Sequence, residues 1–322
     1  MPANLRVIMD VDTGIDDALA LALAVRNPHI QLEAVLTVAG NVSLEQTTRN
    51  TLCVLDWLGA TDVPVARGSD HSLSGPFPDA SQWHGPDGLG GAQLPSSTRP
   101  PLDDGVSYLI DRLLSEPEQL TLVCTAPLTN LARAVHREPR IVDAVREIVL
   151  MGGTARLPGN VTPVAEFNVY SDVHAAATVF NQSWRMTMVG LDVTSKVELT
   201  RAQREALRDQ TAPEAVLVRE VTRFIFETRG LNRVLLHDAL AVAVTIDPDM
   251  VSTIDRAVHV ETRGEHTLGQ TVVDLRSQIQ GGPARGPTRV CLDVDVPRFK
   301  SLFFGSLGLL GQAQDTLGVE RT

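Results

Sequence analysis

Four aspartates lie within eight residues near the N-terminus: Asp10, Asp12, Asp16 and Asp17. Carboxylates this close repel one another unless a cation lies among them, and the hard ions Ca²⁺ and Mg²⁺ prefer oxygen ligands. Helix capping would explain Asp16 or Asp17 alone, because the helix macrodipole favours negative charge in the first turn. It would not explain all four. The cluster therefore predicts a divalent metal site.

The segments on either side of the cluster indicate how its side chains are positioned. The apolar run 5–11 is typical of a buried strand, and the Ala/Leu-rich run 18–25 favours a helix. On a strand, Asp10 and Asp12 point to the same face because side chains alternate. Gly14 permits a tight turn before the helix. The cluster is thus expected at a strand-to-helix junction.

Strand and helix patterns alternate along the remaining chain. This predicts an α/β fold with a mainly parallel, doubly wound, open Rossmann-like sheet that is covered on both faces. We expect one domain over residues 1–322, with active-site loops at about 67–104 and 152–171. Strands are predicted at 32–38, 119–125, 147–151 and 186–191, with a β-rich tail at 254–295. Helices are predicted after Ser43, over 105–115, from Pro127, from Asp172, over 200–210 and 213–228, from near Asp238, and over 297–310.

Composition restricts the class of protein. The net charge of −11 argues against a nucleic-acid-binding surface, which needs a basic footprint. The sequence has no apolar run long enough to span a membrane and no signal-peptide pattern at its N-terminus. The three cysteines, Cys53, Cys124 and Cys291, have no metal-binding spacing and are expected as buried free thiols. We therefore expect a cytoplasmic protein.

Polar residues follow several of the predicted strands. Ligands of open parallel sheets bind outside the carboxyl ends of the strands, so these residues are expected at one site. Besides the aspartate cluster, they are Asn41, Thr125, Met151 with the following Asn160, Glu166 and Asn168, and Asp192. Their coincidence on one edge is a stronger argument than any one of them alone.

At this point the sequence resembles the nucleoside hydrolases, which act on inosine and uridine. The resemblance begins with the aspartate signature at 10–18, where Thr13 stands at a position that is more often proline. Further blocks follow in family order over nearly the whole chain: Val38-Ala39-Gly40-Asn41, 83–90, 125–132, Met151-Gly152-Gly153, 165–169, Leu191-Asp192-Val193-Thr194, 237–241 and 271–274.

The resemblance implies that a ribonucleoside, purine or pyrimidine, is hydrolysed to ribose and free base for salvage or catabolism. One Ca²⁺ per chain would be held by Asp12, Asp17, the carbonyl of Thr125 and Asp238. Asp12 would be the general base and His237 would assist departure of the base, with Asp10 in support. The expected substrate-binding residues are Asp16, Asn41, His84, Met151, Asn160, Glu166 and Asn168. A homodimer or homotetramer is also expected.

Other functions remain open at this stage. Asp10-Val11-Asp12 also begins like the motif of a haloacid dehalogenase-type phosphatase, for which Lys196 is the candidate lysine. Asp12-Thr13-Gly14 is the tripeptide of an aspartic protease, although that fold is all-β. A nucleoside- or sugar-binding protein without activity, or a hydrolase of another ribosyl substrate, would keep the ribose contacts. Ribose release from nucleosides separates these possibilities.

Overall fold

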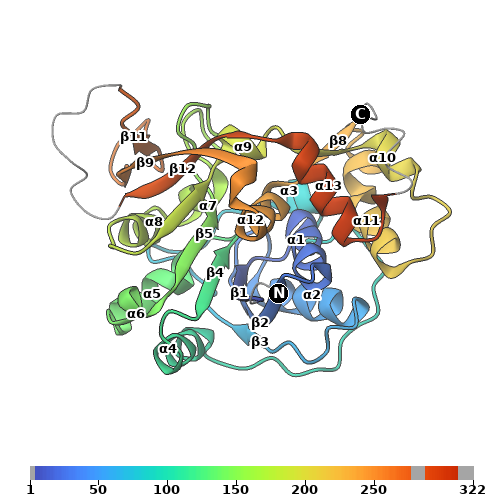
Figure 1. The fold of residues 1–322 in the computed structure, drawn as a ribbon, viewed down its shortest axis with the longest axis horizontal. Coiled ribbons are helices and arrows are strands. Elements are labelled where there is room, and N and C mark those ends of the chain that lie inside the picture. The colour runs from blue at the N-terminus through green and yellow to red at the C-terminus, as the bar shows by residue number, and fades with distance from the viewer. Residues whose placement is uncertain (1–3, 277–286, 311–322) are drawn as a thin grey trace.

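A twisted sheet of eight strands forms the centre of the protein, and helices cover both of its faces (Figure 1). The structure, a computed structural model, describes residues 4–276 and 287–310. Neighbouring strands of the sheet are parallel except for the pair β12 and β9. In spatial order the strands are β3 (Val65–Arg67), β2 (Ile30–Thr37), β1 (Leu5–Val11), β4 (Leu120–Cys124), β5 (Glu147–Met151), β6 (Met186–Val189), β12 (Thr288–Val294) and β9 (Val251–Arg256).

The two faces of the sheet are buried by two apolar clusters. Along β1, Val7 and Met9 belong to one cluster and Ile8 to the other, as alternation of side chains requires. The first face packs against α1 (Ile15–Arg26), α2 (Leu44–Trp57), α11 (Pro213–Arg223), α12 (His237–Ile246) and α13 (Val296–Ser306). The second packs against α4 (Gly105–Ser115), α5 (Thr129–Arg137), α6 (Ile141–Ala144) and α8 (Val173–Phe180). The predicted doubly wound α/β sheet is confirmed.

Short elements account for most differences from the sequence-based expectations. Two elements occur where the loop 67–104 was expected: the edge strand β3 ends at its start, and the helix α3 (Ser81–His84) lies within it. The helix α7 (Phe167–Ser171) lies within the other expected loop, 152–171. The strand expected over 186–191 ends at Val189 because Gly190 is the N-cap of α9 (Leu191–Thr194). The helix expected from Pro127 begins at Thr129.

The helix expected over 213–228 changes its geometry part-way. It continues from α11 as the π-helix η1 (Phe224–Thr228), and α10 (Arg201–Glu205) is shorter than expected. The remaining elements are the pairs β7 (Glu198–Thr200) with β8 (Arg233–Leu235) and β10 (Val258–Val260) with β11 (Thr271–Val273), and the 3₁₀ turn η2 (Pro248–Met250).

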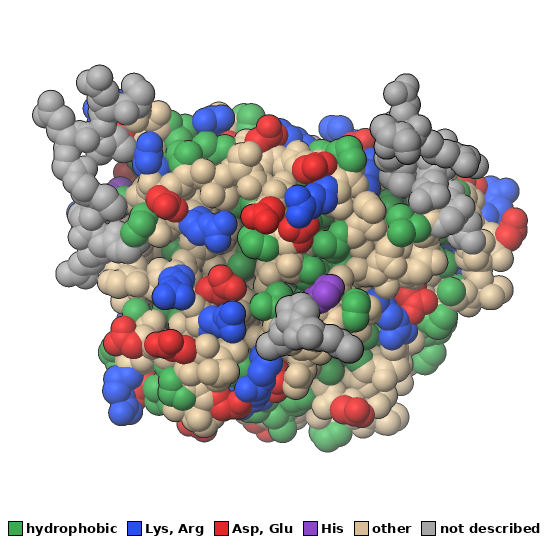
Figure 2. Space-filling view, viewed as in Figure 1, with side chains coloured by type: hydrophobic (Ala, Val, Ile, Leu, Met, Phe, Trp, Pro, Cys, Tyr) green, Lys and Arg blue, Asp and Glu red, His purple; other side chains and the backbone are tan. Residues whose placement is uncertain are grey.

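No helix in the described ranges is long and apolar enough to cross a membrane. On the face shown in Figure 2, Lys and Arg side chains lie interspersed with Asp and Glu side chains. Cys53, Cys124 and Cys291 are all buried free thiols, as expected.

Candidate active site

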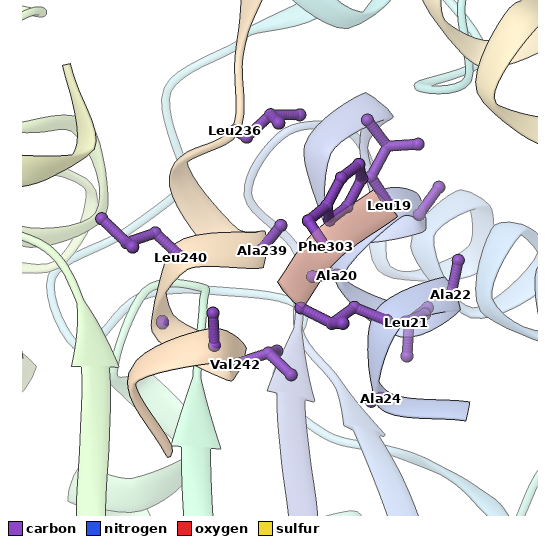
Figure 3. Packing of buried hydrophobic residues seen from close by; sticks show 14 of the residues in the cluster. Leu19, Ala20, Leu21, Ala22, Ala24, Leu236, Ala239, Leu240, Val242 and Phe303 are labelled. Atoms are coloured by element: carbon purple, nitrogen blue, oxygen red, sulfur yellow. The ribbon is translucent and has the colours of Figure 1, made fainter. Parts of the chain in front are cut away.

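Helices α1 and α12 pack side by side and bring their first turns together. Small side chains, among them Ala20 of α1 and Ala239 of α12, occupy the space between the two helices (Figure 3). Alanine has no bulk beyond Cβ, so the two backbones can approach closely. The packing therefore places the acidic first turn of α1 beside the acidic first turn of α12.

Carboxylates from these two turns form a cluster. Oxygens of Asp16, Asp17 and Asp238 all lie within 4.8 Å of one another, and Asp17 and Asp238 are buried. Anions at this separation in a largely buried site repel strongly. Such a group of oxygens is suited to hold a metal ion of the hard class.

The side chain of Asp17 is fixed by three hydrogen-bond donors. Its Oδ1 accepts from the hydroxyl of Thr125 at 2.9 Å, and its Oδ2 accepts from the main-chain N–H of Gly14 at 2.9 Å and from Nδ2 of Asn41 at 3.2 Å. Residues that follow β1, β2 and β4 thus converge on one carboxylate. This is the meeting of strand ends that the sequence predicts.

Asp12 lies beside this cluster but is held differently. Its Oδ2 accepts from the main-chain N–H of Asn41 at 2.8 Å, whereas its Oδ1 is buried and accepts no hydrogen bond from the described residues. Gly40 makes the close approach possible, because a Cβ atom there would lie 2.1 Å from Asp12 Oδ2. A buried carboxylate oxygen without a donor is costly, so a cation or a water is the partner that it lacks.

The negative charges of the cluster would be stabilised by a nearby positive charge. Burial, together with the charge of Asp16, raises the pKa of Asp17 to about 7. Burial, and next the charge of Asp17, raises the pKa of Asp12 well above its usual value. The pKa of Asp238 is raised in the same direction, by burial and by the charges of Asp16 and Asp17. Without a cation, the cluster binds protons to relieve the repulsion.

Asp10, near the end of β1, is buried and is bound by Asn130. Its Oδ1 accepts from Nδ2 of Asn130 at 2.8 Å, and the same Nδ2 lies 3.2 Å from the carbonyl of Thr37. Asn130 Oδ1 accepts from the N–H of Ser69. Burial raises the pKa of Asp10 to about 7, and the bond from Asn130 opposes the rise. Asn130 thereby joins the ends of β1, β2 and β3; it lies in a recognised block, but the sequence analysis assigned it no role.

Asn168 bridges the ends of β4 and β5. Its Nδ2 donates to the carbonyl of Thr125 at 2.9 Å and to that of Met151 at 3.2 Å. A carbonyl oxygen has two lone pairs, so Thr125 can accept this bond and still face a cation. The ligand role of Thr125 remains a prediction.

Glu166 and Asn160 order the loop that precedes α7. Glu166 caps α7: its Oε1 accepts from the N–H of Asn168, and its Oε2 from the N–H groups of Gly153 and Val169. Burial raises the pKa of Glu166. Asn160 Oδ1 accepts from the N–H of Phe167 at 2.9 Å.

A cavity of about 710 Å³ opens above these groups. Ten of the residues predicted for the site line it: Asp16, Asn41, His84, Thr125, Met151, Asn160, Glu166, Asn168, His237 and Asp238. Apolar side chains from α3, from η1 and from the segment between η1 and α12 complete the wall; they include Trp83, Ile225 and Leu231. Asp10, Asp12 and Asp17 are not part of the lining.

Two histidines lie in the wall of the cavity. His84 Nδ1 accepts from the main-chain N–H of Ile15 at 3.0 Å, so the proton of its neutral imidazole is on Nε2. His237 Nδ1 lies 2.8 Å from the hydroxyl of Thr194. Burial lowers the pKa of both rings, although the charge of Asp16 opposes this. Both imidazoles are therefore biased toward the neutral form.

Arg229, at the end of η1, joins this element to α3, and its sequence position alone gives no sign of that role. Its guanidinium carbon lies 4.3 Å from the centre of the Trp83 ring, and it also donates to the carbonyl of Gln82. A cation over an indole face is attractive. The π-helix immediately before Arg229 is the kind of irregularity often found at functional sites, and sequence periodicity alone does not separate it from α11.

The model of the inosine-uridine preferring nucleoside hydrolases matches residues 7–301. The chain belongs to the nucleoside hydrolase family. It is 41% identical over 315 residues to the inosine-uridine preferring nucleoside hydrolase of Leishmania major, covering 96% of this chain and 99% of that one. It is 40% identical over 298 residues to a non-specific ribonucleoside hydrolase of Salmonella enteritidis, covering 92% and 95%.

Solved structures agree with the sequence relatives. The structure of a purine-preferring ribonucleoside hydrolase from Gardnerella vaginalis superposes with a TM-score of 0.88 and 35% identity, covering 94% of this chain and 98% of that one. The nucleoside hydrolase described here is thus an enzyme that cleaves the N-glycosidic bond of ribonucleosides.

The structure bears on the other functions considered. Lys196, which a phosphatase would need, forms an ion pair with Asp293 at 2.8 Å, and both side chains are exposed. It is not among the residues that line the cavity. The eight-stranded α/β sheet is also different from the all-β fold of an aspartic protease.

Proposed function

We propose that this nucleoside hydrolase is Ca²⁺-dependent, with one ion per chain held by Asp12, Asp17, Asp238 and the carbonyl of Thr125. The proposal is carried by one observation: Asp12 Oδ1 is buried, accepts no hydrogen bond from the described residues, and lies beside carboxylates with raised pKa values. Asp16 belongs to the same cluster and is assigned to a ribose hydroxyl. When bound, the ion would lower the pKa of a water molecule and leave coordination positions for the substrate.

The residues of the chain have distinct tasks in this proposal. Asp12 accepts the proton of the attacking water, because its Oδ1 has no competing donor among the described residues. As the water oxygen bonds to C1′ of the ribose, the bond from C1′ to the base breaks and its electron pair leaves with the base. His237 faces that base and stabilises the charge that develops on it.

The ribose is held by side chains that the protein itself orients. Asn41, Asn160 and Asn168 each make a side-chain hydrogen bond that fixes the plane of the amide. Glu166 differs, because both of its oxygens already accept main-chain N–H groups. We therefore expect Glu166 to contribute negative potential near the ribose as well as order in the loop, which suits an oxocarbenium-like transition state.

Base preference is expected to depend on the wall formed by α3 and the segment after η1. Relatives of this chain are named as inosine-uridine preferring, non-specific and purine-preferring enzymes. A purine or a pyrimidine ribonucleoside is therefore the proposed substrate, in nucleoside salvage or catabolism. We also propose that the protein is cytoplasmic and forms a homodimer or homotetramer. Light scattering on the purified protein would test the state of assembly.

The experiment is a reducing-sugar assay on a panel of ribonucleosides, with metal-free protein and with added Ca²⁺. We expect ribose release only with the ion, and about one Ca²⁺ per chain by elemental analysis. Full activity of protein verified as metal-free would overturn the metal assignment. Ribose release from a different ribosyl compound but from no nucleoside would overturn the substrate class.

A further inference from the structure

Thr194 contacts His237, one of the two histidines in the wall of the cavity. It is fully buried at the end of α9, which follows β6 directly. Its Oγ1 lies 2.8 Å from Nδ1 of His237, the first residue of α12. The neighbouring Asp192 does not compete for this ring, because its carboxylate accepts from the N–H groups of Ala155 and Arg156.

The direction of the hydrogen bond between Thr194 and His237 follows from the donors and acceptors that are present. Among the described residues, His237 Nδ1 is the one hydrogen-bond partner that the structure gives to the Thr194 hydroxyl. If Nδ1–H donated to Oγ1, the buried hydroxyl hydrogen would have no acceptor there, which is costly. The hydroxyl therefore donates to Nδ1. The proton of the neutral ring is then on Nε2.

We propose that Thr194 is a positioning residue that holds neutral His237 in the Nε2–H tautomer, so that the ring offers a hydrogen bond to the leaving base. The inference rests on the proposed role of His237. A main-chain carbonyl in place of the hydroxyl would force the opposite tautomer.

The tautomer can be observed directly, without an activity measurement. In protein labelled with ¹⁵N-histidine, the His237 resonances are assigned by comparison with the His237→Ala variant. We expect an Nε2–H ring in the parent protein and a mixture of tautomers in Thr194→Val, which keeps the shape and removes the hydroxyl. An Nδ1–H ring in the parent, or an unchanged tautomer in Thr194→Val, would overturn the inference.

Kinetics provide a second, independent measurement. Thr194→Val should lower kcat for inosine or uridine about tenfold, the effect of losing one hydrogen bond in the transition state. Cleavage of p-nitrophenyl riboside, whose leaving group needs little assistance, should change much less. Thr194→Ser, which keeps the hydroxyl, should retain most of the parent kcat. Equal losses on both substrates with weakened Ca²⁺ binding would mean that Thr194 only supports Asp238.

Two further variants separate the possible failures. Thr245→Val removes another buried hydroxyl bonded within α12, at Ala241, and should leave the ratio of the two rates unchanged. His237→Ala tests the proposed function itself, with an expected loss of about 10²-fold on inosine. If that variant hydrolyses inosine normally, the role of His237 fails, whereas the ¹⁵N spectrum still decides what Thr194 does.

Discussion

The main-chain N–H of Asn41 donates to Oδ2 of Asp12 at 2.8 Å, while Oδ1 of the same carboxylate is buried and has no donor among the described residues. One oxygen is thus fixed in orientation and the other is left for a cation or a water. This division suits a carboxylate that takes up a proton during a reaction, because its reactive oxygen has no hydrogen bond from the described residues to lose.

Replacement of Asp12 by asparagine tests this assignment. The amide keeps one oxygen but cannot act as a base at neutral pH, so kcat should fall by roughly 10²–10⁴-fold at saturating Ca²⁺. Asp10→Asn is the matched control, since its remaining oxygen can still accept from Asn130. Its loss should be much smaller. Near-normal turnover of Asp12→Asn in the ribose assay would rule out Asp12 as the base.

Metal affinity should depend on pH. The pKa of Asp17 is raised to about 7, so below pH 7 this carboxylate increasingly holds a proton that Ca²⁺ must displace. Affinity should fall as pH decreases, by up to about tenfold per pH unit for each proton displaced. Calorimetric titrations between pH 5.5 and pH 8 measure this. A Ca²⁺ affinity independent of pH over this range would contradict the raised pKa of the cluster.

The enzyme should recognise the sugar through the ribose hydroxyl groups. Asp16, a member of the carboxylate cluster, and Asn168 both line the cavity, where the ribose 2′- and 3′-hydroxyls are proposed to bind. A site that pairs hydroxyls leaves buried polar groups unsatisfied when an analogue lacks them. We expect kcat/KM for 2′-deoxyuridine to be at least about 100-fold below that for uridine. Similar values for the two substrates would show that the hydroxyl contacts are not made.

Gly14 is required by the space around it. A Cβ atom there would lie 2.4 Å from His84 Nδ1 and 2.8 Å from Asn41 Nδ2, although its φ of −103° is open to any residue. Gly14→Ala should therefore displace both side chains and raise KM while the fold is retained. In Gly305→Ala, within α13, the new methyl would meet the end of the flexible Leu310 at 3.0 Å. This control should keep the parent KM and a thermal midpoint close to that of the parent.

Much of the site could be predicted from local sequence. The run before Asp12 is apolar throughout and the run after Asp17 is rich in alanine and leucine, so the strand-to-helix junction follows from hydrophobic pattern and helix propensity alone. Parallel sheets gather ligands at the carboxyl ends of their strands, so residues after other strands, such as Asn41 and Asn168, could be assigned to the same edge.

The tertiary structure decided how these residues are used. Asn41 bonds both Asp12 and Asp17, Glu166 uses its oxygens on main-chain N–H groups, and Thr194 reaches His237 across 43 positions of sequence. The periodicity of hydrophobic residues predicts which side chains lie on the buried face of a helix or strand, because it reflects burial. Hydrogen-bond partners far apart in sequence depend on how helices such as α1 and α12 pack, which involves the shapes of many side chains at once.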